Sequence, residues 1–161
     1  MDTRNSIEAI KSRRTTGLVH VDVVEREKNI QCKELAFEKV KESFISHTFS
    51  FADFEKSLSR IESREMAFNI LVHLLNKDMA YDTEIMTLEK AKELAAAFFA
   101  LFEEDAFYFS NSTWNINLYR TNKDIQFGLS SWSSLTDSTF DSGIIICDNR
   151  KIGFVWFEDE D

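Results

Sequence analysis

The chain has 161 residues, of which 43% are hydrophobic and 29% charged, and its formal net charge is -9 at pH 7. This length fits one domain, and no apolar run approaches the roughly 18 residues that a membrane span requires. Proline is absent and glycine occurs only four times, which excludes flexible linkers and collagen-like segments. We therefore expect a single domain over residues 1–161, helical up to about residue 104 and a β-meander from about residue 105.

The negative charge is concentrated in the C-terminal third. Residues 1–100 hold 15 basic and 17 acidic side chains, whereas residues 101–161 hold 4 and 11. Such a charge repels nucleic-acid phosphates and anionic lipids, so we expect no direct nucleic-acid partner and no membrane partner. Met1 to Thr16 lacks the apolar region of a secretory signal, which predicts a cytoplasmic protein. Cys32 and Cys147 lie far apart in segments that look buried, and they are predicted to be free thiols in the core.

Helical spacing of apolar residues dominates the first two thirds of the chain. It predicts five helices: from Asn5 or Ser6 to residue 14, over 25–45, from Ser50 or Asp53 to 61, over 63–77, and from Asp82 or Thr87 to 102. Between the first two, valines at 19, 21 and 23 alternate with His20 and Asp22, which fits a half-buried strand or the opening turn of the next helix. The last helix loses its polar face between Phe98 and Phe102, so we expect this end to be buried or bound.

After Asp105 the pattern changes to the alternation that is typical of strands. The predicted strands are Ala106 to Ser110, Trp114 to Arg120, Ile125 to Trp132, Gly143 to Cys147 and Ile152 to Phe157. The short connections at 121–124 and 148–151 fit hairpins and favour an antiparallel meander. The predicted fold class is α+β, with the N-terminal helices packed on one face of a C-terminal antiparallel sheet of four to five strands.

The common motifs of enzymes and nucleotide-binding proteins, among them GxGxxG, GxxxxGK[ST], HExxH and GxSxG, do not occur. His20 and Asp22 would share one face of a strand, which fits an acid/base pair, a metal site or, as we favour, an ordinary solvent face. We expect no catalytic residue, no metal site and no cofactor.

For two further features, a pair of aspartates and a basic cluster, we favour a structural interpretation over a functional one. Asp137 and Asp141 lie in the polar segment Leu135 to Gly143, which fits a turn better than a cation site shared with Asp148. Basic residues at 11, 13 and 14 fit the last turn of the first helix. The segment Ser6 to Thr16 is also similar to the opening of flavin-dependent nitroreductases, which implies an arginine holding a cofactor phosphate. The glycine- and proline-containing segments of that family are absent downstream.

Aromatic and acidic residues of the C-terminal third predict a protein-binding surface. Serines flank Trp132 on both sides, and the acidic tail Glu158 to Asp161 directly follows an aromatic strand. Carboxylates interspersed with aromatic rings suit a partner whose functional face is basic. The predicted partner-binding residues are Trp132, Asp137, Asp141, Glu158, Asp159 and Glu160, with Trp114 and Tyr119 as aromatic anchors.

In size, acidity and the style of residues 135–143 and 156–161, the chain resembles bacterial toxin-immunity proteins of contact-dependent growth inhibition and related polymorphic toxin systems. This resemblance implies a cytoplasmic inhibitor, not an enzyme, that occludes the active surface of one cognate toxin, basic and nuclease-like. The alternatives are an acidic mimic of nucleic acid, an adaptor that self-associates through Phe98 to Phe102, and an enzyme whose site includes His20 and Asp22. The sequence leaves the oligomeric state open.

Overall fold

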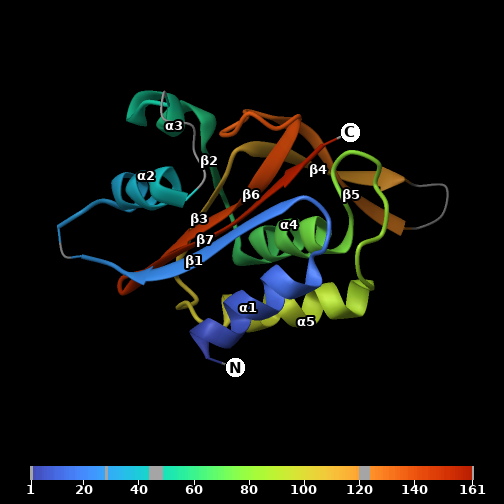
Figure 1. Cartoon of the computed structure of the whole chain (residues 1–161), viewed down its shortest axis with the longest axis horizontal. Coiled ribbons are helices and arrows are strands. Elements are labelled where there is room, and N and C mark those ends of the chain that lie inside the picture. The colour runs from blue at the N-terminus through green and yellow to red at the C-terminus, as the bar shows by residue number, and fades with distance from the viewer. Residues whose placement is uncertain (1, 28, 44–48, 120–123, 161) are drawn as a thin grey trace.

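The computed structural model describes residues 2–27, 29–43, 49–119 and 124–160, with the backbone alone for 113–119 and 124–130. Figure 1 shows the arrangement of its elements. The described helices are α1 (Thr3–Arg13), α2 (Cys32–Ser43), α3 (Phe51–Ser57), α4 (Arg64–Asn76) and α5 (Leu88–Phe99). The described strands are β1 (Leu18–Glu25), β2 (Ser59–Ile61), β3 (Phe107–Ser110), β4 (Ser112–Tyr119), β5 (Asp124–Trp132), β6 (Phe140–Cys147) and β7 (Lys151–Asp159).

Side-chain caps determine where several helices begin. Ser50, Ser63 and Thr87 each accept a hydrogen bond from a backbone N–H in the first turn of α3, α4 and α5. These three residues are among the predicted starts. The first helix begins earlier than predicted, because the carboxylate of Asp2 caps it by accepting from the Asn5 N–H at 2.8 Å.

The main sheet has the strand order β1-β7-β6-β3-β2, and every pair of neighbours is antiparallel. Residues 18–24 join this sheet: β1 pairs with β7 from Leu18 opposite Glu158 to Glu25 opposite Lys151. The second helix therefore begins at Cys32 and not at residue 25. The end of the predicted third helix is a short strand, β2, which forms the other edge of the sheet.

The strands do not form the continuous meander that the short connections predicted. β3 pairs with β6, and β4 pairs with β5 in a separate two-stranded sheet. Figure 1 shows this hairpin extending to one side of the main sheet. The predicted hairpin turn at 121–124 lies mostly outside the described residues, whereas the turn between β6 and β7 is confirmed. Strands that are neighbours in sequence pair within each hairpin, β4 with β5 and β6 with β7. The pairing of β3 with β6, by contrast, depends on tertiary packing.

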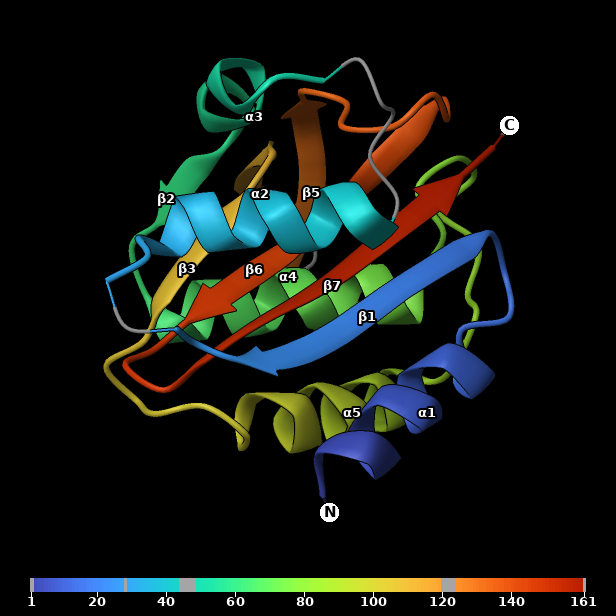
Figure 2. The ribbon, with the colours of Figure 1, turned by 60° about the vertical axis from the view of Figure 1, so that its left-hand side comes forward.

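Helices cover both faces of the main sheet, and the prediction of one covered face is wrong. α1, α4 and α5 pack on the face that includes Val155 and Phe157 of β7. α2 and α3 pack on the opposite face, which includes Phe154 and Trp156. Figure 2 shows α2 on one side of the sheet and α4 on the other. β6 and β7 are therefore buried on both faces, which explains their nearly continuous apolar sequence.

The apolar end of α5 is buried inside the molecule. Burial was one of the two outcomes, burial or binding, that the sequence predicted for it. Phe98 is fully buried and Phe102 is 6% exposed. Phe102 lies so close to Gly153 of β7 that a Cβ there would come within 2.5 Å of its ring. Self-association through Phe98 to Phe102 stays a prediction, and the buried rings of Phe98 and Phe102 would not take part in it. None of the described helices combines the length and apolar content needed to cross a membrane.

The two cysteines form a disulfide, so the prediction of free thiols is wrong. Cys32 is the first residue of α2 and Cys147 the last of β6, with Cα atoms 6.0 Å apart. Cys147 is fully buried, as the sequence predicted. The bond closes a loop with a sequence separation of 115 residues, which no spacing pattern reveals because the partners meet only when α2 packs on the sheet.

We expect reduction of this disulfide to lower the free energy of unfolding by about 4 kcal/mol, because a cross-link over so long a loop restricts the unfolded chain. Urea denaturation with and without a phosphine reductant measures the change. The variant Cys32→Ala serves as the control, since it should match the reduced wild type and show no response to the reductant. An oxidised wild type no more stable than Cys32→Ala would contradict this prediction.

Candidate functional site

Three carboxylates, two exposed and one mostly buried, gather where β7 ends beside the loop that leads into β6. We call this surface the acidic corner and define it by Asp137, Glu158 and Glu160 with Ser138 and Thr139. Asp137 and Glu160 are exposed, and the Glu158 side chain is 11% exposed. The C-terminus labelled in Figures 1 and 2 marks its place at the end of β7.

Glu158 is held by partners from two other elements. One carboxylate oxygen, Oε2, lies 2.6 Å from Nε2 of His20 in β1, and the other, Oε1, accepts from the Ser138 hydroxyl at 2.8 Å. Because β1 and β7 are paired along their length, the His20 position is set by the sheet itself. The carboxylate therefore has a defined orientation, with only a small part of the side chain exposed.

Glu160 is fixed in a similar way by the loop. Its oxygens accept from the backbone N–H of Thr139 at 3.2 Å and from the Thr139 hydroxyl at 2.7 Å. These hydrogen bonds, with a further one from Ser138, lower the pKa of Glu160, so it stays ionised. Of the predicted partner-binding acids, Asp137, Glu158 and Glu160 lie together at this corner. The tail up to Glu160 is thus part of the fold.

Asp159 does not lie on the accessible surface, contrary to expectation. Its side chain is 1% exposed and points to the opposite face of the sheet, where it meets Arg14. Arg14 Nη1 and Nη2 donate to the two Asp159 oxygens at 2.9 and 2.8 Å, and the Met79 N–H donates to Oδ2 at 2.9 Å. A carboxylate with this set of internal donors is a structural residue, and it is not available to a partner.

Arg14 is not part of an exposed basic cluster and is not free to hold a phosphate. It is 2% exposed, and its remaining donors bind the carbonyls of Leu74 at 2.8 Å and Thr16 at 2.7 Å. Its guanidinium also lies 4.3 Å from the centre of the Phe157 ring. The implied flavin-phosphate role therefore has no support in the structure.

Asp141 is also buried, and the expectation that it contacts a partner is not met. Its side chain is fully inaccessible to solvent. Oδ2 accepts from the backbone N–H groups of Leu135 and Thr136 at 2.9 and 2.6 Å. Oδ1 accepts from the side-chain amide of Asn111 at 3.0 Å. The turn that we favoured for this segment is thus built on Asp141. Burial raises the pKa of Asp141 to about 6, hydrogen bonds from Thr136 and Leu135 oppose the rise, and the negative Glu158 adds to it.

The aromatic residues have mixed positions. Trp132 is half-buried at the end of β5, with its ring 5.1 Å from that of Phe140 in β6. It therefore presents part of its surface beside exposed Ser131, Ser133 and Ser134. Trp114 and Tyr119 belong to β4, opposite Leu129 and Asp124, and their side chains lie outside the described part of the chain.

The residues considered for metal or acid/base chemistry have hydrogen-bond partners within the fold. His20 binds Glu158, Asp22 accepts from the backbone N–H of Val23, and Asp148 forms the turn between β6 and β7 by accepting from Arg150 and Lys151. Among the described residues, no group of three or more His, Cys, Asp or Glu side chains is placed to hold a metal ion.

The sequence did not identify Ser138 and Thr139 as the residues that orient the acidic corner. They lie about twenty positions from their partners, and a Ser-Thr pair in a polar loop is typical of an ordinary turn. One sequence signal was present, the alternation of side chains along β7 and into Glu160 directly after it. In extended chain this alternation places Glu158 and Glu160 on one face and Asp159 on the other.

Comparisons with known proteins give no relative. No protein-family model, curated protein or solved structure matches this chain.

We expect Asp159→Ala to lower the free energy of unfolding by about 3–5 kcal/mol, because it leaves the buried Arg14 guanidinium without its carboxylate. Urea denaturation measures the loss. The control is Glu93→Ala, which removes the exposed Lys90–Glu93 pair and should cost under about 1 kcal/mol. The double variant Arg14→Met, Asp159→Leu should recover part of the stability. A loss below about 1 kcal/mol for Asp159→Ala would show that the pair is dispensable.

The buried Asp141 should make stability depend on pH. Its folded pKa of about 6 exceeds the ordinary 3.8, so its contribution is full below pH 4 and is lost as pH rises through 6. Relative to Asp141→Asn, we expect wild type to lose about 2.4 kcal/mol between pH 4 and pH 7. Paired urea denaturation curves at both pH values test this. A difference that stays constant with pH would contradict the raised pKa.

Proposed function

We propose that this protein is an inhibitor that binds one cognate protein with a basic functional face and occludes that face with the acidic corner. The observation that carries the proposal is the ordered placement of Glu158 and Glu160. Their carboxylates are held by His20, Ser138 and Thr139, beside exposed Asp137.

Orientation matters because ordering flexible side chains on binding costs free energy. A glutamate at a free chain end would lose rotamer freedom when it met a partner, whereas these two are already positioned by the sheet and the loop. Fixed carboxylates at defined spacing suit guanidinium and ammonium groups, which form charge-assisted hydrogen bonds with them. The half-buried Trp132 supplies an aromatic surface that carries no charge of its own.

The overall charge supports the same role through the rate of association. A net charge of -9 produces a negative potential that attracts a basic protein over distances comparable to the Debye length. Attraction of this kind raises the association rate, and buried contacts set the residence time. The resemblance to toxin-immunity proteins implies a partner of complementary charge, a basic, nuclease-like toxin.

The cellular location stays a prediction. A disulfide between Cys32 and Cys147 is commoner in proteins of oxidising compartments than in cytoplasmic ones. The oxidation state of this pair in cells, measured by alkylation of free thiols before lysis, distinguishes the two locations.

The partner is tested by co-expressing the tagged chain with the product of the adjacent gene. We expect a stable complex and loss of that neighbour's toxicity. A harmless neighbour that does not co-purify would contradict the assignment of a toxin partner.

The surface is tested with the double variant Asp137→Lys, Glu160→Lys. We expect the association rate with the partner to fall about tenfold at low salt, because the local field at the contact is reversed. The control is Glu38→Lys, Glu55→Lys, which changes the net charge equally at exposed positions of α2 and α3 and should have a smaller effect. Stopped-flow measurement at two ionic strengths provides the rates. Equal losses in both variants would show that net charge, and not the acidic corner, directs association.

A further inference from the structure

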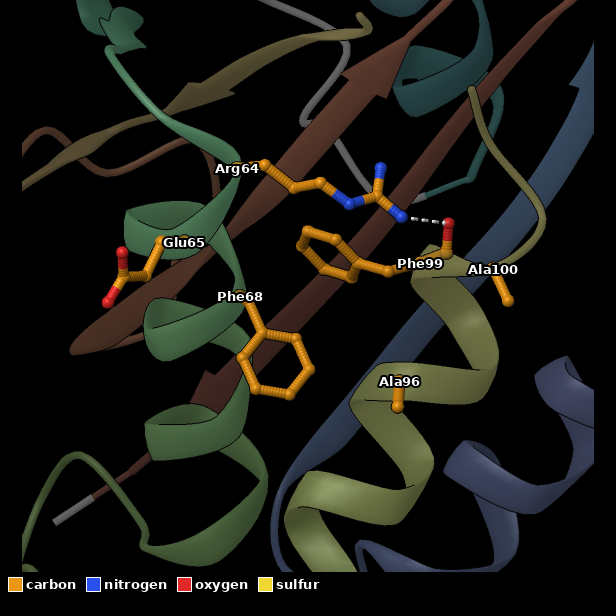
Figure 3. Close-up of a pocket in the computed structure, with 6 residues that line it drawn as sticks. All are labelled: Arg64, Glu65, Phe68, Ala96, Phe99 and Ala100. Carbon is orange, nitrogen blue, oxygen red and sulfur yellow. Dashed lines mark hydrogen bonds between the residues drawn. The ribbon is translucent and has the colours of Figure 1, made fainter. Parts of the chain in front are cut away.

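A shallow apolar groove of about 420 Å³ lies between the start of α4 and the end of α5. Its lining residues are Arg64, Glu65, Phe68, Ala96, Phe99 and Ala100. Figure 3 shows the two phenylalanine rings between the helices, with the alanine methyl groups on the α5 side. This groove is separate from the acidic corner, which lies at the end of β7.

The walls of the groove are held by internal contacts. The rings of Phe68 and Phe99 meet edge to face at 5.6 Å, and Phe99 stacks on Tyr108 of β3 at 5.8 Å. Ala96 and Ala100 are exposed and one helical turn apart, so the α5 side offers methyl groups where larger side chains would fill the hollow. The groove is therefore a preformed apolar surface, and a ligand need not open it.

Arg64 closes one end of the groove and brings a positive charge there, with its guanidinium 5.3 Å from the centre of the Phe99 ring. Its Nη2 donates to the carbonyl of Phe99 at 2.9 Å, and its Nη1 donates to the Tyr108 hydroxyl at 2.9 Å and the Glu103 carbonyl at 3.3 Å. These bonds satisfy carbonyls at the carboxyl end of α5 and hold the guanidinium against the protein, so its charge has a fixed place at this end of the groove.

Beyond Arg64, the charges around the groove are mainly negative. Glu65 lies at its rim, and the exposed residues Glu103, Glu104 and Asp105 follow α5 directly, beside Arg64. Lys92, one turn before Ala96 on α5, is the exposed positive residue on the same stripe. An apolar hollow next to a cluster of carboxylates is complementary to an apolar side chain flanked by basic ones.

We propose that this groove is a second docking surface, which takes a bulky apolar side chain flanked by lysine or arginine on an exposed segment of a protein partner. A second copy of this chain is a poor occupant, because two molecules with a net charge of -9 repel each other. The proposal does not depend on the acidic corner, and either surface can fail without the other.

The proposal is tested with the probe peptide acetyl-Lys-Lys-Phe-Lys-Lys-amide, titrated into ¹⁵N-labelled protein and followed by NMR. We expect shifts centred on Phe68, Ala96 and Ala100, with a dissociation constant on the order of 1 mM. The peptide with alanine in place of phenylalanine should bind about tenfold more weakly, since it lacks the apolar anchor. Raised salt should weaken both peptides.

Two matched variants locate the binding. Ala96→Phe fills the groove and should weaken the phenylalanine peptide about tenfold, whereas Ala52→Phe makes the same change at an exposed position of α3 and should have no effect. The NMR spectra of both variants show directly whether they are folded. Shifts confined to the acidic corner, equal affinity of the two peptides, or an unchanged affinity in Ala96→Phe would each overturn the proposal. Absence of groove shifts up to about 5 mM peptide would do so as well.

Discussion

The buried pair between Arg14 and Asp159 connects elements from both ends of the chain. Arg14 follows α1 and reaches a carbonyl of α4, while Asp159 ends β7 and accepts from the loop after α4. Two buried charges are stable only when their hydrogen-bonding groups are satisfied, and this pair has partners on both sides. Because the pair fixes the end of β7, it also fixes the positions of Glu158 and Glu160 on either side of Asp159. The surface of the acidic corner thus depends on an interaction beneath it.

The acidity of the C-terminal third has two different physical roles. Asp141, Asp148 and Asp159 are buried and satisfy backbone or guanidinium donors, so they hold loops and strands in place. Asp137 and Glu160 are exposed and contribute to the external field. A count of carboxylates therefore overstates the surface charge available to a partner. Of these two, Glu160 is oriented by the backbone N–H and hydroxyl of Thr139, so it needs less ordering when it meets a partner.

The acidic corner and the α4–α5 groove offer two kinds of contact. The corner presents oriented carboxylates beside a half-buried tryptophan, and the groove presents rigid aromatic walls near further carboxylates. Both suit partners with basic residues, but only the groove provides a preformed hollow for an apolar anchor. Charge mainly raises the association rate, whereas buried apolar contacts mainly lower the dissociation rate. Changes at the corner would therefore affect association, and changes at the groove would affect dissociation.

The sequence by itself determined the helices, most of the strands and the α+β class, because the spacing of apolar residues and the capping residues act locally. It also placed Asp137, Glu158 and Glu160 among the candidate residues. Only the tertiary structure decided that helices cover both faces, that β3 pairs with β6, that Cys32 meets Cys147, and that Asp141 and Asp159 are buried. These outcomes depend on contacts between residues distant in sequence. The pattern of one segment contains no information on which distant partner satisfies a buried charge or thiol.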